Sequence, residues 1–136
     1  MNYKISSPVS VILPRKTKKD KIIYLNLNVY RNTHFQILNQ IKVRYKELIL
    51  PQLESLPEFV YINTIEYIWY PRINNRSDVS NVCCIIDKFF CDALVESGHL
   101  PDDNHNFIKE IRYKYGEVNK LNPRVDIIIN GEINGN

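Results

Sequence analysis

The sequence predicts one domain of the α/β (α+β) class, with a mixed sheet of about four strands and two main helices in the order β-α-β-α-β-β. Three observations predict it. The chain has 136 residues, which suits a single domain with a buried core. Hydrophobic residues make up 44% of it and charged residues 24%, as in ordinary globular proteins. Segments rich in β-branched and aromatic residues alternate with segments of helical periodicity.

The first predicted elements are a strand and an amphipathic helix. Ile22–Val29 carries the β-branched and aromatic residues that favour a strand. Asn32 or Thr33 then stands where a helix cap is needed. Pro51 and Pro57 bracket the end of that helix. Its apolar residues recur at steps of three and four and are Phe35, Leu38, Ile41, Tyr45, Leu48 and Ile49.

The remaining elements are a long strand, a second helix and two more strands. Val60–Tyr70 is rich in Ile, Tyr, Thr and Trp, which predicts a strand. Ser80–Ser97 returns to helical period, and Gly98 occupies the position of a helix-ending glycine. Ile108–Tyr115 and Arg124–Ile129 predict the last two strands. We assign residues 1–130 to the domain and residues 131–136 to a polar, flexible tail.

Several classes of protein are disfavoured by composition. No apolar run approaches the length of a membrane span, and the N-terminus lacks the apolar core of a signal peptide, so we expect a cytoplasmic protein without a membrane partner. Cys83, Cys84 and Cys91 lack zinc-site spacing and are interpreted as small core or boundary residues. The three histidines are scattered and also predict no zinc site.

Charge is distributed unevenly along the chain. Residues 1–46 contain ten Lys or Arg and one acid, whereas residues 47–136 contain eight Lys or Arg and fourteen acids. This asymmetry predicts one surface that binds phosphates and another that binds cations. A solvated basic loop at Arg15–Lys21 without any partner is the alternative interpretation.

Carboxylates gather at both ends of the second predicted helix. Asp78 precedes that helix, and Asp102 and Asp103 follow it by a few residues. Lys88 and Asp92 are four residues apart and share one helix face. Carboxylate oxygens with open coordination positions are what Mg²⁺ requires. For Asp78 to approach the Asp102–Asp103 pair, either the chain folds back or a partner subunit contributes, and the sequence leaves both open.

Three blocks in this region resemble the signature of a known family. They are Asp78-Val79-Ser80-Asn81, Lys88-Phe89-Phe90-Cys91-Asp92-Ala93-Leu94, and Gly98-His99-Leu100-Pro101-Asp102-Asp103. Their order and the helix between them resemble the RusA-like Holliday junction resolvases of phages and prophages. The resemblance is densest over residues 76–104, and the order of elements over about residues 20–130 is compatible with it.

The resemblance implies a homodimeric endodeoxyribonuclease that binds four-way DNA junctions and resolves them by paired strand nicks with Mg²⁺ or Mn²⁺. It implies a role in phage DNA recombination, repair or replication inside a bacterial host, without a small-molecule cofactor. The catalytic residues would be Asp78, Asp103 and Lys88, and the metal ligands Asp78, Asp92, Asp102 and Asp103. We expect the DNA phosphates to be bound by Arg15, Lys16, Lys18, Lys19, Lys21, Arg31 and Arg76.

Two departures from the family pattern keep other interpretations open. Ser80 replaces the second acid of the first block, which removes a charge from the expected metal site. The family lysine position is occupied by Cys84, and Lys88 lies one helical turn further on, which could bring Asp87 or Asp92 into the site. A junction-binding protein without nuclease activity is therefore the alternative function. An acidic site unrelated to DNA is a third possibility.

Overall fold

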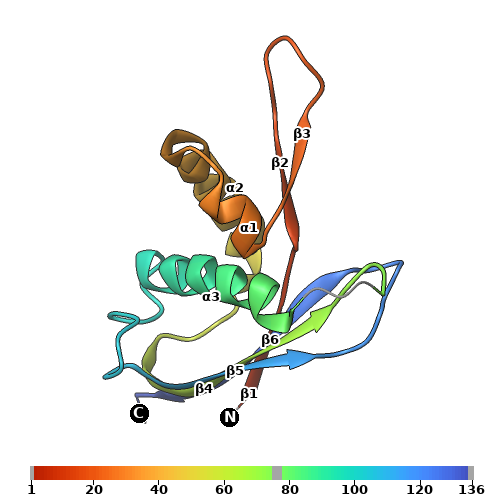
Figure 1. Ribbon diagram of the computed structural model, residues 1–136. Helices are drawn as coiled ribbons and strands as arrows, with labels where there is room; N and C mark the ends of the chain where they lie inside the picture. The colour runs from red at the N-terminus through yellow and green to blue at the C-terminus, as the bar shows by residue number, and fades with distance from the viewer. Residues whose placement is uncertain (1, 75–77, 135–136) are drawn as a thin grey trace.

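A four-stranded mixed sheet forms one layer of the molecule, and two long helices lie on one side of it (Figure 1). The computed structural model describes residues 2–74 and 78–134. In spatial order the sheet contains β1 (Asn2–Ser7), β6 (Arg124–Ile133), β4 (Phe59–Tyr70) and β5 (Ile108–Tyr115), and the two helices are α2 (Phe35–Leu53) and α3 (Val79–Glu96). The predicted fold class, an α+β domain with a mixed sheet, is confirmed.

The centre of the sheet is built by β4, whose alternate residues face the helices. Ile65, Tyr67 and Trp69 of this strand are buried beneath α3. β4 pairs in parallel with β5 and antiparallel with β6, and α3 is the crossover between the two parallel strands. The predicted strands at Val60–Tyr70 and Ile108–Tyr115 are therefore confirmed, and they carry α3 across the sheet.

The N-terminal region differs from the expected strand at Ile22–Val29. A short strand, β3 (Lys21–Tyr24), pairs with β2 (Ser10–Leu13) in a hairpin outside the main sheet. The chain then turns at Asn26, whose side-chain oxygen accepts a hydrogen bond from the Val29 amide at 2.9 Å and begins the helix α1 (Leu27–Arg31). The strands β1 and β2 and the helix α1 were not predicted, so the predicted order of elements is incomplete.

Helix α2 begins beyond the predicted caps and ends between the two prolines, as predicted. His34, rather than Asn32 or Thr33, caps it, because the His34 ring nitrogen Nδ1 accepts from the Gln36 amide at 3.2 Å. Pro51 lies inside the last turn, which ends at Leu53. The buried side of α2 consists of Ile41, Tyr45, Ile49 and Leu53.

Helix α3 is close to its predicted range and ends as predicted. Gly98 adopts a φ of +82°, the left-handed conformation that lets the chain reverse at a helix end. The His99 amide then donates to the Leu94 carbonyl at 3.0 Å. This sharp ending fixes where the acidic segment after Leu100 leaves the helix.

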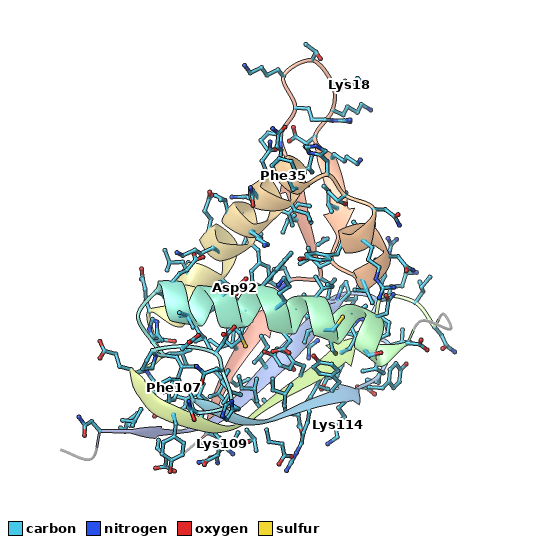
Figure 2. The ribbon with its side chains drawn as sticks, turned by 60° about the vertical axis from the view of Figure 1, so that its left-hand side comes forward. Lys18, Phe35, Asp92, Phe107, Lys109 and Lys114 are labelled. Atoms are coloured by element: carbon cyan, nitrogen blue, oxygen red, sulfur yellow. The ribbon has the colours of Figure 1, made fainter. Side chains whose placement is uncertain are left out.

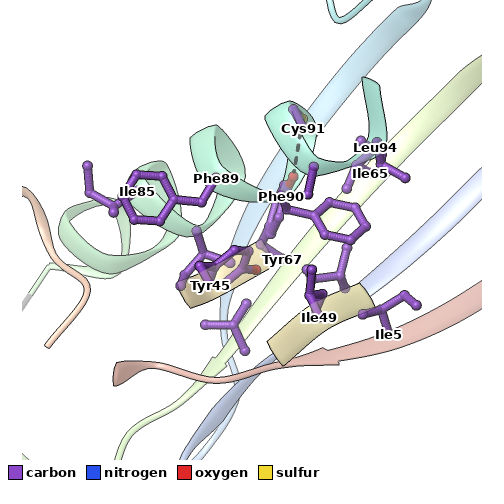
Figure 3. Packing of buried hydrophobic residues seen from close by; sticks show 14 of the residues in the cluster. Ile5, Tyr45, Ile49, Ile65, Tyr67, Ile85, Phe89, Phe90, Cys91 and Leu94 are labelled. Atoms are coloured by element: carbon purple, nitrogen blue, oxygen red, sulfur yellow. Dashed lines mark hydrogen bonds between the residues drawn. The ribbon is translucent and has the colours of Figure 1, made fainter. Parts of the chain in front are cut away.

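The core lies between α2, α3 and the sheet (Figure 3). Tyr45 and Ile49 of α2 meet Phe89 and Phe90 of α3, with Ile5 of β1 below them. The Tyr45 hydroxyl is satisfied inside the core by the Ser7 hydroxyl at 2.7 Å. As predicted, Cys83 and Cys91 are buried and Cys84 lies at the boundary, and all three are free thiols.

Strand β6 continues past the predicted end at Ile129. It reaches Ile133, so much of the segment expected to be a tail belongs to the sheet. Gly131 makes this extension possible, because a Cβ atom at this position would lie 2.5 Å from the ring of Phe59 on β4. The close approach of the two strands therefore depends on the missing side chain.

Candidate functional site

The expected first acidic residue, Asp78, lies at the N-terminus of α3. It has the extended backbone of a helix cap, yet its side chain makes no capping hydrogen bond. Asp78 is exposed, as is Ser80 in the first turn of the helix. A purely capping role therefore does not explain Asp78. The helix dipole favours a carboxylate at this end of α3.

The second acidic group, Asp102 and Asp103, lies beyond the other end of α3. Asp102 organises the turn, since its two oxygens accept from the Asp103 amide at 2.7 Å and from the Asn104 side chain at 2.9 Å. The pKa of the Asp103 carboxyl is raised, first by desolvation and then by its contact with Asp102, with a smaller contribution from Asp92. A group of mutually repelling carboxyls of this kind is relieved by a proton or a cation.

The two acidic groups are held apart by α3 itself. An 18-residue helix is about 27 Å long, so Asp78 and Asp103 of one chain do not meet around one ion. The loop after α3 brings Asp103 beside Asp92 but not to the Asp78 end of the helix, so within one chain the two acidic groups stay apart. Within residues 2–74 and 78–134, no three His, Cys, Asp or Glu side chains group as metal ligands.

The two remaining predicted residues of α3 lie between these ends. Lys88 is exposed and its ammonium group lies 6.0 Å from the centre of the Tyr30 ring, so it leans toward α1. Asp92, visible on α3 in Figure 2, is half-buried and lines a groove between α2 and α3. The fold brings Asp92 near Asp103, which Asp102 also contacts, so three of the four predicted metal ligands lie close together.

Asp87 forms a cluster that the sequence did not reveal. One carboxylate oxygen accepts from the Tyr67 hydroxyl at 2.7 Å and from the Cys91 thiol at 3.2 Å, and the other accepts from the Tyr113 hydroxyl at 2.9 Å. Burial raises the pKa of Tyr67, Tyr113 and Cys91, and the Asp87 carboxylate raises it further. All three therefore remain protonated donors. Asp87 holds α3 against β4 and β5, and its oxygens are already occupied.

Five of the predicted phosphate-binding residues lie in a basic hairpin, defined here as residues 15–21, which comprise most of the loop between β2 and β3 and the first residue of β3. This segment projects away from the sheet and helices, with Lys18 at its tip (Figures 1 and 2). The Arg15 side chain donates to the Lys19 carbonyl at 2.7 Å and braces the loop. The exposed cations are Arg15, Lys16, Lys18, Lys19 and Lys21.

Positive charge continues from the hairpin toward α3. Arg31 is exposed at the end of α1 and lies near Cys84 of α3. Burial raises the pKa of the Cys84 thiol, and the nearby Arg31 charge partly offsets this rise. A hollow of about 670 Å³ lies between the base of the hairpin and the first turn of α3, with Tyr24, Arg72 and Asn81 among its lining residues. An aromatic and polar wall of this kind can stack an unpaired base. Arg76, another expected phosphate contact, lies outside the described residues.

Comparison with known proteins identifies no relative of this chain, so the candidate site is described from its geometry. No protein-family model matches the chain, and no curated protein matches it significantly. No helix in the described part of the chain is long and apolar enough to cross a lipid bilayer.

Proposed function

We propose that this protein is a cytoplasmic, metal-dependent endodeoxyribonuclease that binds four-way DNA junctions as a homodimer. The observation that carries the proposal is the pair of acidic groups at opposite ends of α3, of which Asp78 makes no cap and Asp103 is crowded by other carboxyls. The same molecule presents an exposed basic hairpin. Acidic ligands and a phosphate-binding surface are the two requirements of such an enzyme.

In a symmetric dimer the acidic groups would form two equivalent sites, each built from both copies of the chain. Because α3 separates them within a copy, Asp78 of one copy would work with Asp102 and Asp103 of the other. All three supply carboxylate oxygens, the donors that suit Mg²⁺ or Mn²⁺, and Asp92 is available beside Asp103. A bound divalent cation would supply an activated water and charge stabilisation for phosphodiester hydrolysis.

The residues around this site have separate tasks in the proposal. Lys88 is the exposed cation on α3 that can neutralise charge on a phosphate held along the helix. The basic hairpin and Arg31 would bind the DNA backbone, which gives strong dependence on salt and little on base sequence. Selectivity for junctions would then come from the shape presented by two hairpins in a dimer.

Junction binding without cleavage is the second candidate function. Ser80 favours it, because a hydroxyl stands where the resembled family has an acid and the ion would be held by one fewer charge. The same basic hairpin would serve both functions. Ser80→Asp is the substitution that separates them, since it restores the missing carboxylate without touching the hairpin.

A cleavage assay tests the proposal directly. A labelled four-way junction and a linear duplex of the same sequence are incubated with the protein and Mg²⁺ or Mn²⁺, beside Asp78→Asn, Asp103→Asn and the exposed control Glu54→Gln. We expect paired nicks in the junction only, lost in both aspartate variants and kept in the control. Junction binding without nicks, even after Ser80→Asp, would reject the nuclease and favour the binding protein.

A further inference from the structure

Strand β5 is an edge of the sheet and is poorly covered by its own chain. Within the described residues, β4 is the strand that pairs with it, and the opposite edge of β5 meets no other strand. Ile111, Tyr113 and Tyr115 stand in register with Ile65, Tyr67 and Trp69, so they share the helix-facing side of the sheet. The three β4 residues are at most 7% exposed. The three β5 residues beside them are much more exposed, Ile111 at 42%, Tyr113 at 38% and Tyr115 at 48%. An edge with apolar side chains of this kind is a template for another strand.

The charged residues on the other face of β5 are complementary to the same residues of a second, antiparallel copy of the strand. Glu110 and Arg112 flank Ile111 and are paired with each other within the chain. In an antiparallel pair centred on Ile111, residues equally far before and after the centre face each other. Glu110 of one copy then faces Arg112 of the other, twice, and Ile111 faces Ile111. A pair centred on Arg112 would also have two opposite-charge pairs, between Glu110 and Lys114, but it would place two arginines face to face. The charges therefore favour the register centred on Ile111 by this one repulsive pair.

We propose that the β5 edge is the surface by which two copies of this chain associate, through an antiparallel β5–β5 pair with its two-fold axis at Ile111. The pair would join two four-stranded sheets into one of eight strands. It would cover the exposed Ile111 and satisfy the backbone groups of the free edge. The partner is a second copy of this chain, because the order Glu110-Ile111-Arg112 is complementary to the same three residues running in the opposite direction.

This arrangement also has a consequence for the acidic groups, which rests on the proposed function. The axis at Ile111 reverses the direction of α3 between copies. The Asp78 end of one helix then lies on the same end of the dimer as the Asp102–Asp103 segment of the partner. The β5–β5 pair is thus the association that can complete the site from two copies.

Cysteine cross-linking tests the register without any DNA. Ile111→Cys places two thiols across the axis, within reach of a disulfide. Tyr115→Cys places them about 26 Å apart, since the strand rises by about 3.3 Å per residue, and serves as the control on the same strand. Leu121→Cys, at a position that is 97% exposed, measures collisional cross-linking, and the wild-type protein measures the background from its own three cysteines. After mild oxidation we expect a covalent dimer for Ile111→Cys at a level well above the other three proteins.

Charge reversal tests the pairing in solution. Light scattering is expected to give twice the chain mass of 16.1 kDa for the wild-type protein. Glu110→Arg or Arg112→Glu alone sets like charges face to face and should weaken the dimer by about tenfold, whereas the double reversal restores opposite charges and the dimer. Thermal unfolding of each variant separates loss of association from loss of folding.

The outcomes separate this inference from the proposed function. A wild-type protein that stays at the mass of one chain, or equal cross-linking of Ile111→Cys and Tyr115→Cys, would overturn the interface. A β5–β5 dimer that cuts no junction would keep the interface and remove the nuclease. A protein that cuts junctions but dimerises elsewhere would do the reverse.

Discussion

Asp87 stabilises the packing of α3 on the sheet, because both of its oxygens accept hydrogen bonds from side chains of β4, β5 and α3. From the sequence it was considered as a residue that could join the metal site. The donors come from Tyr67 and Tyr113, which face each other only because β4 and β5 pair in one particular register. That register cannot be predicted from residue types, so the cluster was beyond sequence analysis.

Removing this carboxylate should destabilise the fold. In Asp87→Ala the buried Tyr67 hydroxyl and the Cys91 thiol lose their acceptor, and we expect the free energy of unfolding to fall by about 2–3 kcal/mol. Urea denaturation measures the change. The control Glu54→Ala, at an exposed position after α2, should change the free energy of unfolding by less than about 0.5 kcal/mol. Equal effects in the two variants would remove the structural role assigned to Asp87.

Gly131 provides a second test at the scale of one residue. Gly131→Ala would set a methyl group against the ring of Phe59, and we expect a loss of about 1–3 kcal/mol in the free energy of unfolding. The smaller side chain in Phe59→Leu should make the same glycine substitution less costly. A double-mutant cycle by urea denaturation measures this coupling. Additive effects of the two substitutions would show that the close approach of β6 to Phe59 is unimportant.

At the scale of elements, long periodic segments could be predicted and short ones could not. β4, α3 and β5 lie within one residue or so of their predicted bounds, because each has a continuous pattern and a clear ending such as Gly98. β1 was missed because Asn2, Lys4 and Ser6 alternate with its inward residues and give it a polar composition. β2 has only four residues, and its partner β3 was merged with the helix that follows.

The hairpin formed by β2 and β3 gives the clearest prediction for an element. Lys18→Gln/Lys19→Gln should weaken junction binding at all salt concentrations and lower the slope of log affinity against log salt by about 2, since each phosphate contact contributes about 0.9. Both lysines are exposed, so stability should not change. Binding is measured by fluorescence anisotropy over a series of salt concentrations.

A matched double substitution elsewhere supplies the control for the hairpin. Lys4→Gln/Lys120→Gln removes the same charge from exposed positions outside the hairpin. We expect its salt slope to stay near that of the wild-type protein. If both double variants lose affinity equally, the basic N-terminal region acts only through net charge, and the hairpin is not a specific contact surface.

At the scale of the whole molecule, the sequence predicted where the acidic residues lie along the chain but not how they could come together in one site. The sequence places Asp78, Asp102 and Asp103 near the ends of one helix, and the structure does the same. A stretch of 18 helical residues then prevents them from meeting within one chain. Whether a second copy completes the site depends on which strand lies at a free edge of the sheet, and the strand order was not predicted from the sequence.

Subunit mixing tests this assembly most directly. A dimer of one Asp78→Asn copy and one Asp103→Asn copy contains one site with both defects and one site with both aspartates intact, if each site takes Asp78 from one copy and Asp103 from the other. After unfolding, equal mixing and refolding, half of the dimers are mixed, so we expect about a quarter of the wild-type nicking rate from two separately inactive proteins. The rate is read on a denaturing gel with a labelled junction. If each site lay within one chain, every site in the mixture would carry a defect and no nicking would return. Mixing Asp78→Asn with a differently tagged Asp78→Asn is the control, since it leaves a defect in every site under either arrangement.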